Sequence, residues 1–310
     1  VARAGSEEQE GRPGAAEQRG DAMRNPIDGF TVSREDLFFV GEDLQRPECI
    51  LAERDGSLWS ADARGGVVHI RPDGTQELIA QALDTRFGAT LDEADRFTQG
   101  TLPNGLAFDV DGSILISNFG TDRLERMTLE GRTTVMLDTI DGTPIGKVNF
   151  VLRDSKGRIW LTISTRITNW MQAISPNIAD GYVAVLDENG ARIVADGFMF
   201  TNEIRFDAAE EWLYVVETSG RRVTRLRIDA DTQVAAREVF GPADTGGFID
   251  GIAFDAFGNL WGTLAGGVIL GVAQTLGAKL HPGFQVLAGH VVFLFILAVR
   301  PRGLFPRIDG

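Results

Sequence analysis

Apolar and polar residues alternate along five stretches of the chain, and a short turn interrupts each stretch. In residues 101–118 the alternation runs through TLPNGLAFDV, breaks at Asp111-Gly112 and resumes in SILISN. Two alternating runs joined by a turn that contains Gly predict a β-hairpin. The same pattern recurs in residues 46–62, 147–162, 200–217 and 248–263.

A polar residue precedes the alternating pattern of each hairpin by two to four positions. These residues are Glu48, Asn104, Asn149, Asn202 and Asp250, and they recur at intervals of roughly 45 to 56 residues. A repeat of this length, built from strands and turns, is typical of β-propellers, whose blades are four-stranded sheets. Residues 56–80 add strand, turn, strand, turn and strand, which completes one such blade. The pattern therefore predicts an all-β propeller.

Both ends of the chain depart from this repeat. Residues 1–25 are polar and rich in Gly, Ala and Glu, so we expect a disordered N-terminal extension before a propeller in residues 26–263. Residues 264–310 hold two apolar stretches separated by KLHPG, which predicts an apolar helical tail where the strands of a sixth blade would stand. The longer run, residues 286–299, is short for a membrane span of about 20 residues. A buried or interfacial helix and a membrane tether both remain open.

Charge and cysteine content limit which partners and which cellular compartment are expected. The net charge of −14 argues against nucleic acid or an anionic membrane as a partner of the main body. Membrane contact is expected only through the tail. The single cysteine, Cys49, permits no internal disulfide and is compatible with the cytoplasm, which is the expected location.

The recurring polar residues have a chemical consequence in a propeller. The first strand of each blade lines the central channel, so the five residues at this repeat position should converge on the axis. Two carboxylates and three amides are poor core residues but suitable oxygen ligands for a hard cation such as Ca²⁺. Asn and Asp before a strand can also serve only to form a turn. Their recurrence in five successive hairpins favours the cation site.

The same stretches resemble the family of senescence marker protein, gluconolactonase and luciferin-regenerating enzyme. The resemblance spans about residues 30–263, with its clearest signals in NFVLRDSKGRIW and DGIAFDAFGNLW. It implies a six-bladed propeller that uses one divalent cation, commonly calcium, to hydrolyse lactones; a related branch hydrolyses phosphotriesters. Zn²⁺, Mg²⁺ or Mn²⁺ are alternatives to Ca²⁺. The implied substrate is a small lactone or sugar acid.

The resemblance also implies roles for particular residues. The implied metal ligands are Glu48, Asn149, Asn202 and Asp250. Asn104 would point at the substrate or a bound water. Lys147 would bind polar groups of the substrate, although it could equally be an ordinary surface lysine. Asp250 is the candidate catalytic base that activates water, with Glu48 as the other candidate.

The chain departs from the family in its expected number of blades. Only five hairpins recur, so we expect an incomplete six-bladed-type propeller of about five blades, with activity impaired by the missing blade. The tail resembles the end of a branched-chain amino acid ABC transporter permease through its VRPRGLF ending, which suggests a chimaeric fusion. The alternatives to a lactonase are a non-catalytic propeller that binds a ligand or partner, and a truncated, inactive family member.

Overall fold

The computed structural model describes residues 39–82 and 100–264, and four single residues before them (25, 29, 31 and 35). The chain divides into two compact units, Val1–Phe39 and Val40–Gly310, and the second holds every strand that the structure describes. The predicted extension of residues 1–25 and the predicted tail of residues 264–310 lie outside the described residues, except for Asn25 and Leu264. The disorder, the helical tail and the fusion therefore stay predictions.

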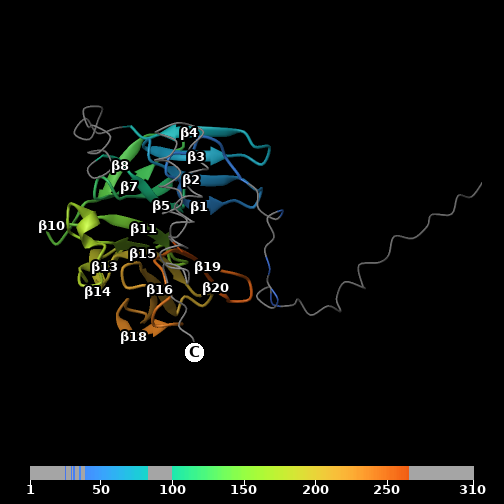
Figure 1. The fold of residues 1–310 in the computed structure, drawn as a ribbon. Coiled ribbons are helices and arrows are strands. Elements are labelled where there is room, and N and C mark those ends of the chain that lie inside the picture. Colours follow the sequence, from blue (N-terminus) through green and yellow to red (C-terminus); the bar gives the residue numbers. More distant parts are fainter. Residues whose placement is uncertain are drawn as a thin grey trace, which may run out of the picture. The chain divides into compact units, whose positions relative to one another are not determined.

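Four antiparallel sheets of four strands follow one another along the described chain (Figure 1). The first contains β1 (Glu48–Ala52), β2 (Leu58–Asp62), β3 (Gly66–Ile70) and β4 (Gln76–Ala80). The second contains β5 (Pro103–Phe108), β6 (Ile114–Asn118), β7 (Arg123–Met127) and β8 (Thr133–Leu137). The third contains β11 (Val148–Arg153), β12 (Ile159–Ile163), β13 (Gly181–Asp187) and β14 (Gly190–Phe198). The fourth contains β15 (Thr201–Phe206), β16 (Trp212–Glu217), β17 (Arg222–Ile228) and β18 (Val234–Phe240).

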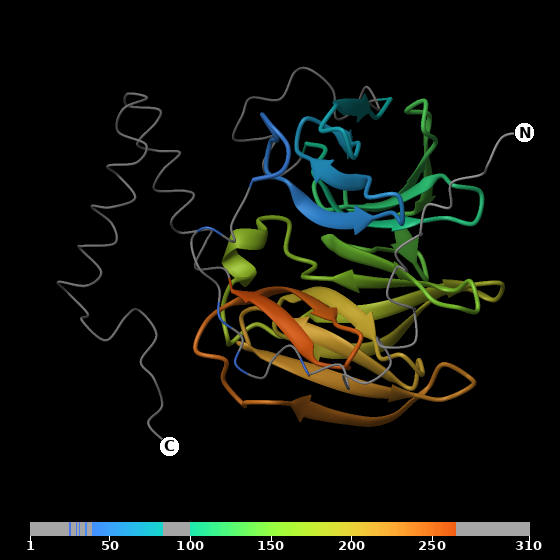
Figure 2. The ribbon, with the colours of Figure 1, turned by 90° about the vertical axis from the view of Figure 1, so that its right-hand side faces the viewer.

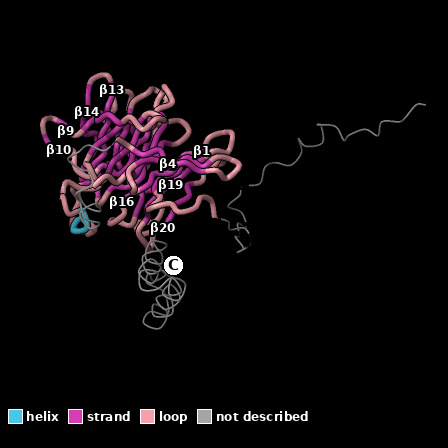
Figure 3. Tube along the Cα trace, turned by 90° about the horizontal axis from the view of Figure 1, so that it is seen from above, coloured by secondary structure: helices cyan, strands magenta, loops and turns pink. Residues whose placement is uncertain are grey.

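Two strand pairs and a short helix lie outside the four-stranded sheets. The remaining strands are β9 (Thr139–Ile140) paired with β10 (Thr143–Pro144), and β19 (Ile249–Phe254) paired with β20 (Leu260–Leu264). A short 3-10 helix, η4 (Trp170–Ala173), interrupts the strands once and is the cyan segment of Figure 3. Among the residues that can be described, no helix is long and apolar enough to cross a membrane.

The first strands of the sheets lie side by side in sequence order. Strand β1 contacts β5, β5 contacts β11, β11 contacts β15, and β15 contacts β19. Figure 2 shows the sheets succeeding one another from blue to orange. Within each four-stranded sheet the strand order is the chain order. Sheets whose strands follow chain order, with their first strands side by side, form a propeller-like arrangement. The all-β prediction is therefore confirmed. The total number of blades stays a prediction.

The predicted hairpins are joined by one recurring turn. Asp109 donates its N–H to the carbonyl of Ser113 at 2.8 Å, and Gly112 donates to the carbonyl of Asp109 at 3.1 Å. Gly112 has a φ of +82°, a conformation that suits glycine. Glu210 takes the corresponding place in the hairpin of β15 and β16, with a φ of +53°.

The hydrophobic core lies between neighbouring sheets. The largest buried side chains between the third and fourth sheets are Phe150, Trp160 and Phe198, which pack with Ile204 and Leu213. Comparable apolar clusters lie between the first and second sheets, between the second and third sheets, and between the fourth sheet and the β19–β20 pair. Face-to-face burial of this kind fixes the inner strands, and the loops before them, relative to one another.

Candidate functional site

Four of the five recurring polar residues lie within a register shift of the first strand of their sheet, and the fifth, Glu48, directly precedes one. The ladder shifts between residues 48 and 50 in β1, 103 and 106 in β5, 148 and 150 in β11, 201 and 204 in β15, and 249 and 252 in β19. A bulge adds an unpaired residue and re-aims its side chain. The repeat of polar residues is thus also a repeat of backbone geometry, which a simple turn-forming role would not require.

A cleft of about 620 Å³ brings four of these five residues together. It is lined by Glu48, Asn104, Asn202 and Asp250, together with the apolar residues Phe150, Ile252 and Trp261. Asn149 is 5% exposed and is absent from the described residues that line the cleft. It is nevertheless linked to the cleft, because the Asn104 amide donates to the Asn149 carbonyl at 2.9 Å and to its Oδ1 at 3.3 Å.

A hydrogen bond joins two of the implied metal ligands directly. Asn202 Nδ2 donates to Asp250 Oδ1 at 2.5 Å and to Thr218 Oγ1 at 3.2 Å. These contacts turn the amide nitrogen toward Asp250 and Thr218, so the amide oxygen of Asn202 faces away from both. The pair therefore presents a carboxylate and an amide oxygen, which are hard donors.

Hydroxyl groups on the second strands fix the backbone around the site. Ser117 Oγ accepts a hydrogen bond from the N–H of Gly105 at 2.7 Å and donates to the carbonyl of Asn149 at 2.6 Å. Thr162 Oγ1 accepts from the N–H of Phe150 at 3.0 Å and donates to the carbonyl of Asn202 at 2.7 Å. Each hydroxyl thus ties a bulge of its own sheet to the bulge of the next. Sequence reasoning missed these residues, although Ser117 and Thr162 occupy matching places in their hairpins.

Three carboxylates share the cleft, and burial raises the pKa of two of them. Burial raises the pKa of Glu48 to about 7, and the negative charges of Asp250 and Glu203 add to this, while the Arg46 guanidinium opposes it. The pKa of Glu203 is also raised, mainly by burial, against the influence of Arg205. Glu203 accepts a hydrogen bond from the N–H of Ile252 at 2.5 Å and one from Arg205 at 2.9 Å. Without a cation, Glu48 therefore binds a proton more readily than an ordinary glutamate.

Sequence reasoning missed Glu203, which lines the cleft, and Arg46, which contacts the cleft residue Glu48. Glu203 follows Asn202 directly, so strict alternation would place it on the opposite face, but the bulge between residues 201 and 204 removes that alternation. Arg46 precedes β1, and its Nη2 lies 3.3 Å from Glu48 Oε1. Cys49 also lines the cleft, and burial raises the pKa of its thiol to about 12, which disfavours the thiolate.

Lys147 lies apart from the cleft. Its side chain is 2% exposed, and its Nζ lies 2.8 Å from Asp122 Oδ1. The ammonium also lies 5.9 Å from the centre of the Phe119 ring. Lys147 is therefore a buried, paired lysine rather than a surface one, and its role in substrate binding stays a prediction.

The donor set fits a hard divalent cation by its chemistry. Glu48, Asn149, Asn202 and Asp250 supply carboxylate and amide oxygens, which Ca²⁺ and Mg²⁺ prefer. Within the described part of the chain, no three His, Cys, Asp or Glu side chains form a metal-binding group by themselves. Some ligands of a cation at this cleft would therefore have to be other oxygen donors, such as the asparagine amides.

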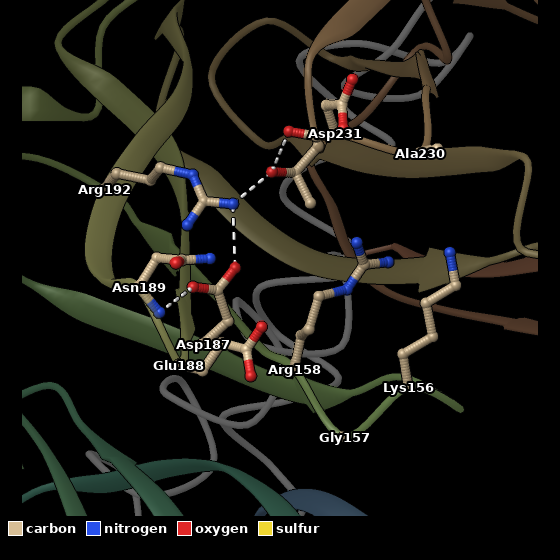
Figure 4. Close-up of a pocket in the computed structure, with 10 residues that line it drawn as sticks. Lys156, Gly157, Arg158, Asp187, Glu188, Asn189, Arg192, Ala230 and Asp231 are labelled. Carbon is tan, nitrogen blue, oxygen red and sulfur yellow. Dashed lines mark hydrogen bonds and ion pairs between the residues drawn. The ribbon is translucent and has the colours of Figure 1, made fainter.

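A second cleft, of about 570 Å³, lies at the turns of the third and fourth sheets (Figure 4). Its Arg192 contacts Asp187 Oδ2 at 2.9 Å and also the hydroxyl of Thr232. Asp187 in turn accepts a hydrogen bond from the N–H of Asn189 at 2.8 Å. Arg192 and Asp187 thus form an ion pair in this cleft, and none of the recurring polar residues lines it.

Comparison with known proteins agrees with the resemblance seen in the sequence. Residues 128–281 match the family model described as SMP-30/Gluconolactonase/LRE-like region. The match thus extends beyond residue 263, where the sequence pattern of the hairpins ends. No curated protein sequence matches the chain.

Solved structures share the fold at low sequence identity. XC5397 from Xanthomonas campestris, a gluconolactonase, has a TM-score of 0.56 and 22% identity, covering 72% of this chain and 71% of that one. Regucalcin from Agrobacterium tumefaciens, a calcium-binding protein, has a TM-score of 0.54 and 18% identity, covering 71% and 68%. A luciferin-regenerating enzyme has a TM-score of 0.55 and 14% identity, covering 71% and 69%.

Proposed function

Residues 128–281 give the chain its place in the SMP-30/gluconolactonase/LRE-like family, and on this premise we propose that it hydrolyses lactones with the help of a divalent cation, in the first place Ca²⁺. The observation that carries the proposal is the recurrence of an oxygen-bearing side chain at the register shift of five neighbouring strands. Four of these side chains line one cleft. The likeness to a gluconolactonase and to a calcium-binding regucalcin supports the same conclusion.

Glu48, Asn149, Asn202 and Asp250 would hold the cation. When bound, a divalent cation polarises the lactone carbonyl and compensates the charge that develops on its oxygen. The hydrogen bond from Asn202 orients the Asp250 carboxylate, which is the proposed base for the attacking water. A base needs a fixed position within hydrogen-bond reach of its proton, and this contact supplies it.

Glu48 is the second proton-handling group of the proposed site. Without a cation, burial raises its pKa to about 7, whereas a cation held by the same carboxylate would lower that pKa. Glu48 would therefore hold the cation in its ionised form and is the alternative to Asp250 as the base. The apolar walls formed by Phe150, Ile252 and Trp261 would exclude bulk water and contact the carbon skeleton of a small lactone.

An assay of the hydrolysis of a small aldonolactone tests the proposal. The release of acid measures the rate. We expect activity that a chelator removes and Ca²⁺ restores, and that Glu48→Gln and Asp250→Asn abolish. Glu77→Gln, at an exposed position of β4, is the matched control and should retain full activity. Ca²⁺ binding without hydrolysis would instead favour the non-catalytic binding propeller, and activity that survives both cleft substitutions would refute the proposed site.

A further inference from the structure

An arginine side chain contacts one candidate metal ligand, Glu48, and the candidate substrate-binding residue Asn104. Arg46 stands two residues before β1 with a φ of +46°. Its Nη2 lies 3.3 Å from Glu48 Oε1 and 3.2 Å from Asn104 Oδ1. A single guanidinium nitrogen thus contacts oxygens from the first and second sheets, both of which line the cleft.

The guanidinium of Arg46 is only partly satisfied there. Its Nη1 is buried and has no hydrogen-bond partner within the described residues. Arg64 shows the contrast, because its Nε and Nη2 bind the two carboxylate oxygens of Asp62 at 2.8 Å each. Two-point pairing of this kind holds an arginine firmly, whereas Arg46 reaches Glu48 through one nitrogen. Arg46 can therefore leave its contacts without breaking a two-point ion pair.

The position of Arg46 follows from the charge of the cleft. Glu48, Glu203 and Asp250 bring three carboxylates into the cleft, and their mutual repulsion requires a positive charge nearby. Arginine is always protonated, so Arg205 beside Glu203 and Arg46 beside Glu48 both supply permanent positive charge. A divalent cation bound through Glu48 would use the same carboxylate and would be repelled by the guanidinium at this distance.

We propose that Arg46 is an internal competitor of the divalent cation and sets the affinity of the site for it. With no cation bound, the guanidinium holds the oxygens of Glu48 and Asn104; when a cation binds, it must move away. This inference rests on the proposed function and deepens it, because it names the residue that determines how much free cation is needed to fill the site.

Calorimetric titration of the full chain with CaCl₂ tests the competition. Arg46→Met removes the charge and keeps an unbranched side chain, and Arg46→Gln serves as a second variant in case the first does not fold. Removing a repelling unit charge within a few ångströms should tighten Ca²⁺ binding by about tenfold or more. Arg132→Met is the control, since Arg132 is 77% exposed and pairs with Glu130 in another turn; it should bind as the unchanged chain does.

The outcomes separate this inference from the proposed function. Tighter binding by an Arg46 variant but not by Arg132→Met supports the competition, as does binding that appears only in the Arg46 variants. Equal or weaker binding by both Arg46 variants overturns it, while Ca²⁺ binding by the unchanged chain would leave the proposed metal site intact. If neither the unchanged chain nor an Arg46 variant binds Ca²⁺, both the competition and the metal site are refuted.

Discussion

The amide of Asn202 donates a hydrogen bond of 2.5 Å to the carboxylate of Asp250, although the two residues lie 48 positions apart. Both stand at the register shift of the first strand of their sheet, and those strands, β15 and β19, are neighbours. The contact therefore depends on the repeat itself, because equivalent positions in successive sheets become adjacent around the shared inner strands.

Asn202→Ala should weaken Ca²⁺ binding by about 10- to 100-fold, because it removes one oxygen donor and the group that orients Asp250. Calorimetric titration measures this effect. Asn189→Ala, in the exposed turn between β13 and β14, removes the same side chain outside the cleft and should not change the affinity. Similar affinities for these two variants would exclude Asn202 from the site.

Thr162→Val should lower the free energy of unfolding by about 2 to 4 kcal/mol, since it leaves the buried N–H of Phe150 and carbonyl of Asn202 without the hydroxyl they share. Urea denaturation measures the loss. Thr134→Val, at an exposed position of β8, is the control and should stay within about 0.5 kcal/mol. A near-neutral Thr162→Val would mean that the hydroxyl does not tie the third sheet to the fourth.

Stability without metal should depend on pH through Glu48. Its pKa is raised from 4.5 to about 7, so the folded state binds the proton more tightly than the unfolded state. The stabilisation from the protonated form is fully present below pH 4.5 and is lost as the pH rises through 7. The loss amounts to roughly 3 kcal/mol, because each pH unit between the two pKa values corresponds to about 1.4 kcal/mol.

Glu48→Gln removes this titration. The difference in unfolding free energy between Glu48→Gln and the unchanged chain should therefore grow from pH 4.5 to 7 in chelator, with the variant becoming relatively more stable. Denaturation curves at several pH values provide the comparison. A constant difference across this range would show that Glu48 keeps an ordinary pKa in the folded chain.

Much of the fold and some of the site could be predicted from the sequence. The five hairpins stand where alternation and turns placed them. Successive side chains of a strand point to opposite faces of its sheet, and both faces pack against neighbouring sheets, as Trp160 and Leu161 of β12 do in different apolar clusters. Glu48, Asn104, Asn202 and Asp250 share one cleft, as their repeat position implies. Convergence could be predicted because it follows from topology alone.

The remaining features depend on geometry that residue patterns do not encode. The bulge in β15 brings Glu203 to the cleft beside Asn202, whereas strict alternation would separate them. The contact of Arg46 with Glu48 follows from a backbone conformation at positive φ, which the sequence does not predict for arginine. Burial of Lys147 beside Asp122 likewise depends on a loop of the second sheet. The blade count and the tail rest on residues outside the described range.

Thermal unfolding with and without Ca²⁺ tests the metal site most directly, in the unchanged chain and in Asp250→Ala. A ligand that binds only the folded state raises the melting temperature, by an amount equivalent to about 2.7 kcal/mol at 100 times its dissociation constant. We predict a higher melting temperature for the unchanged chain in Ca²⁺ than in chelator, and no such difference for Asp250→Ala. An identical melting temperature of the unchanged chain in Ca²⁺ and in chelator, or a full response that survives in Asp250→Ala, would contradict a cation site built from these oxygens.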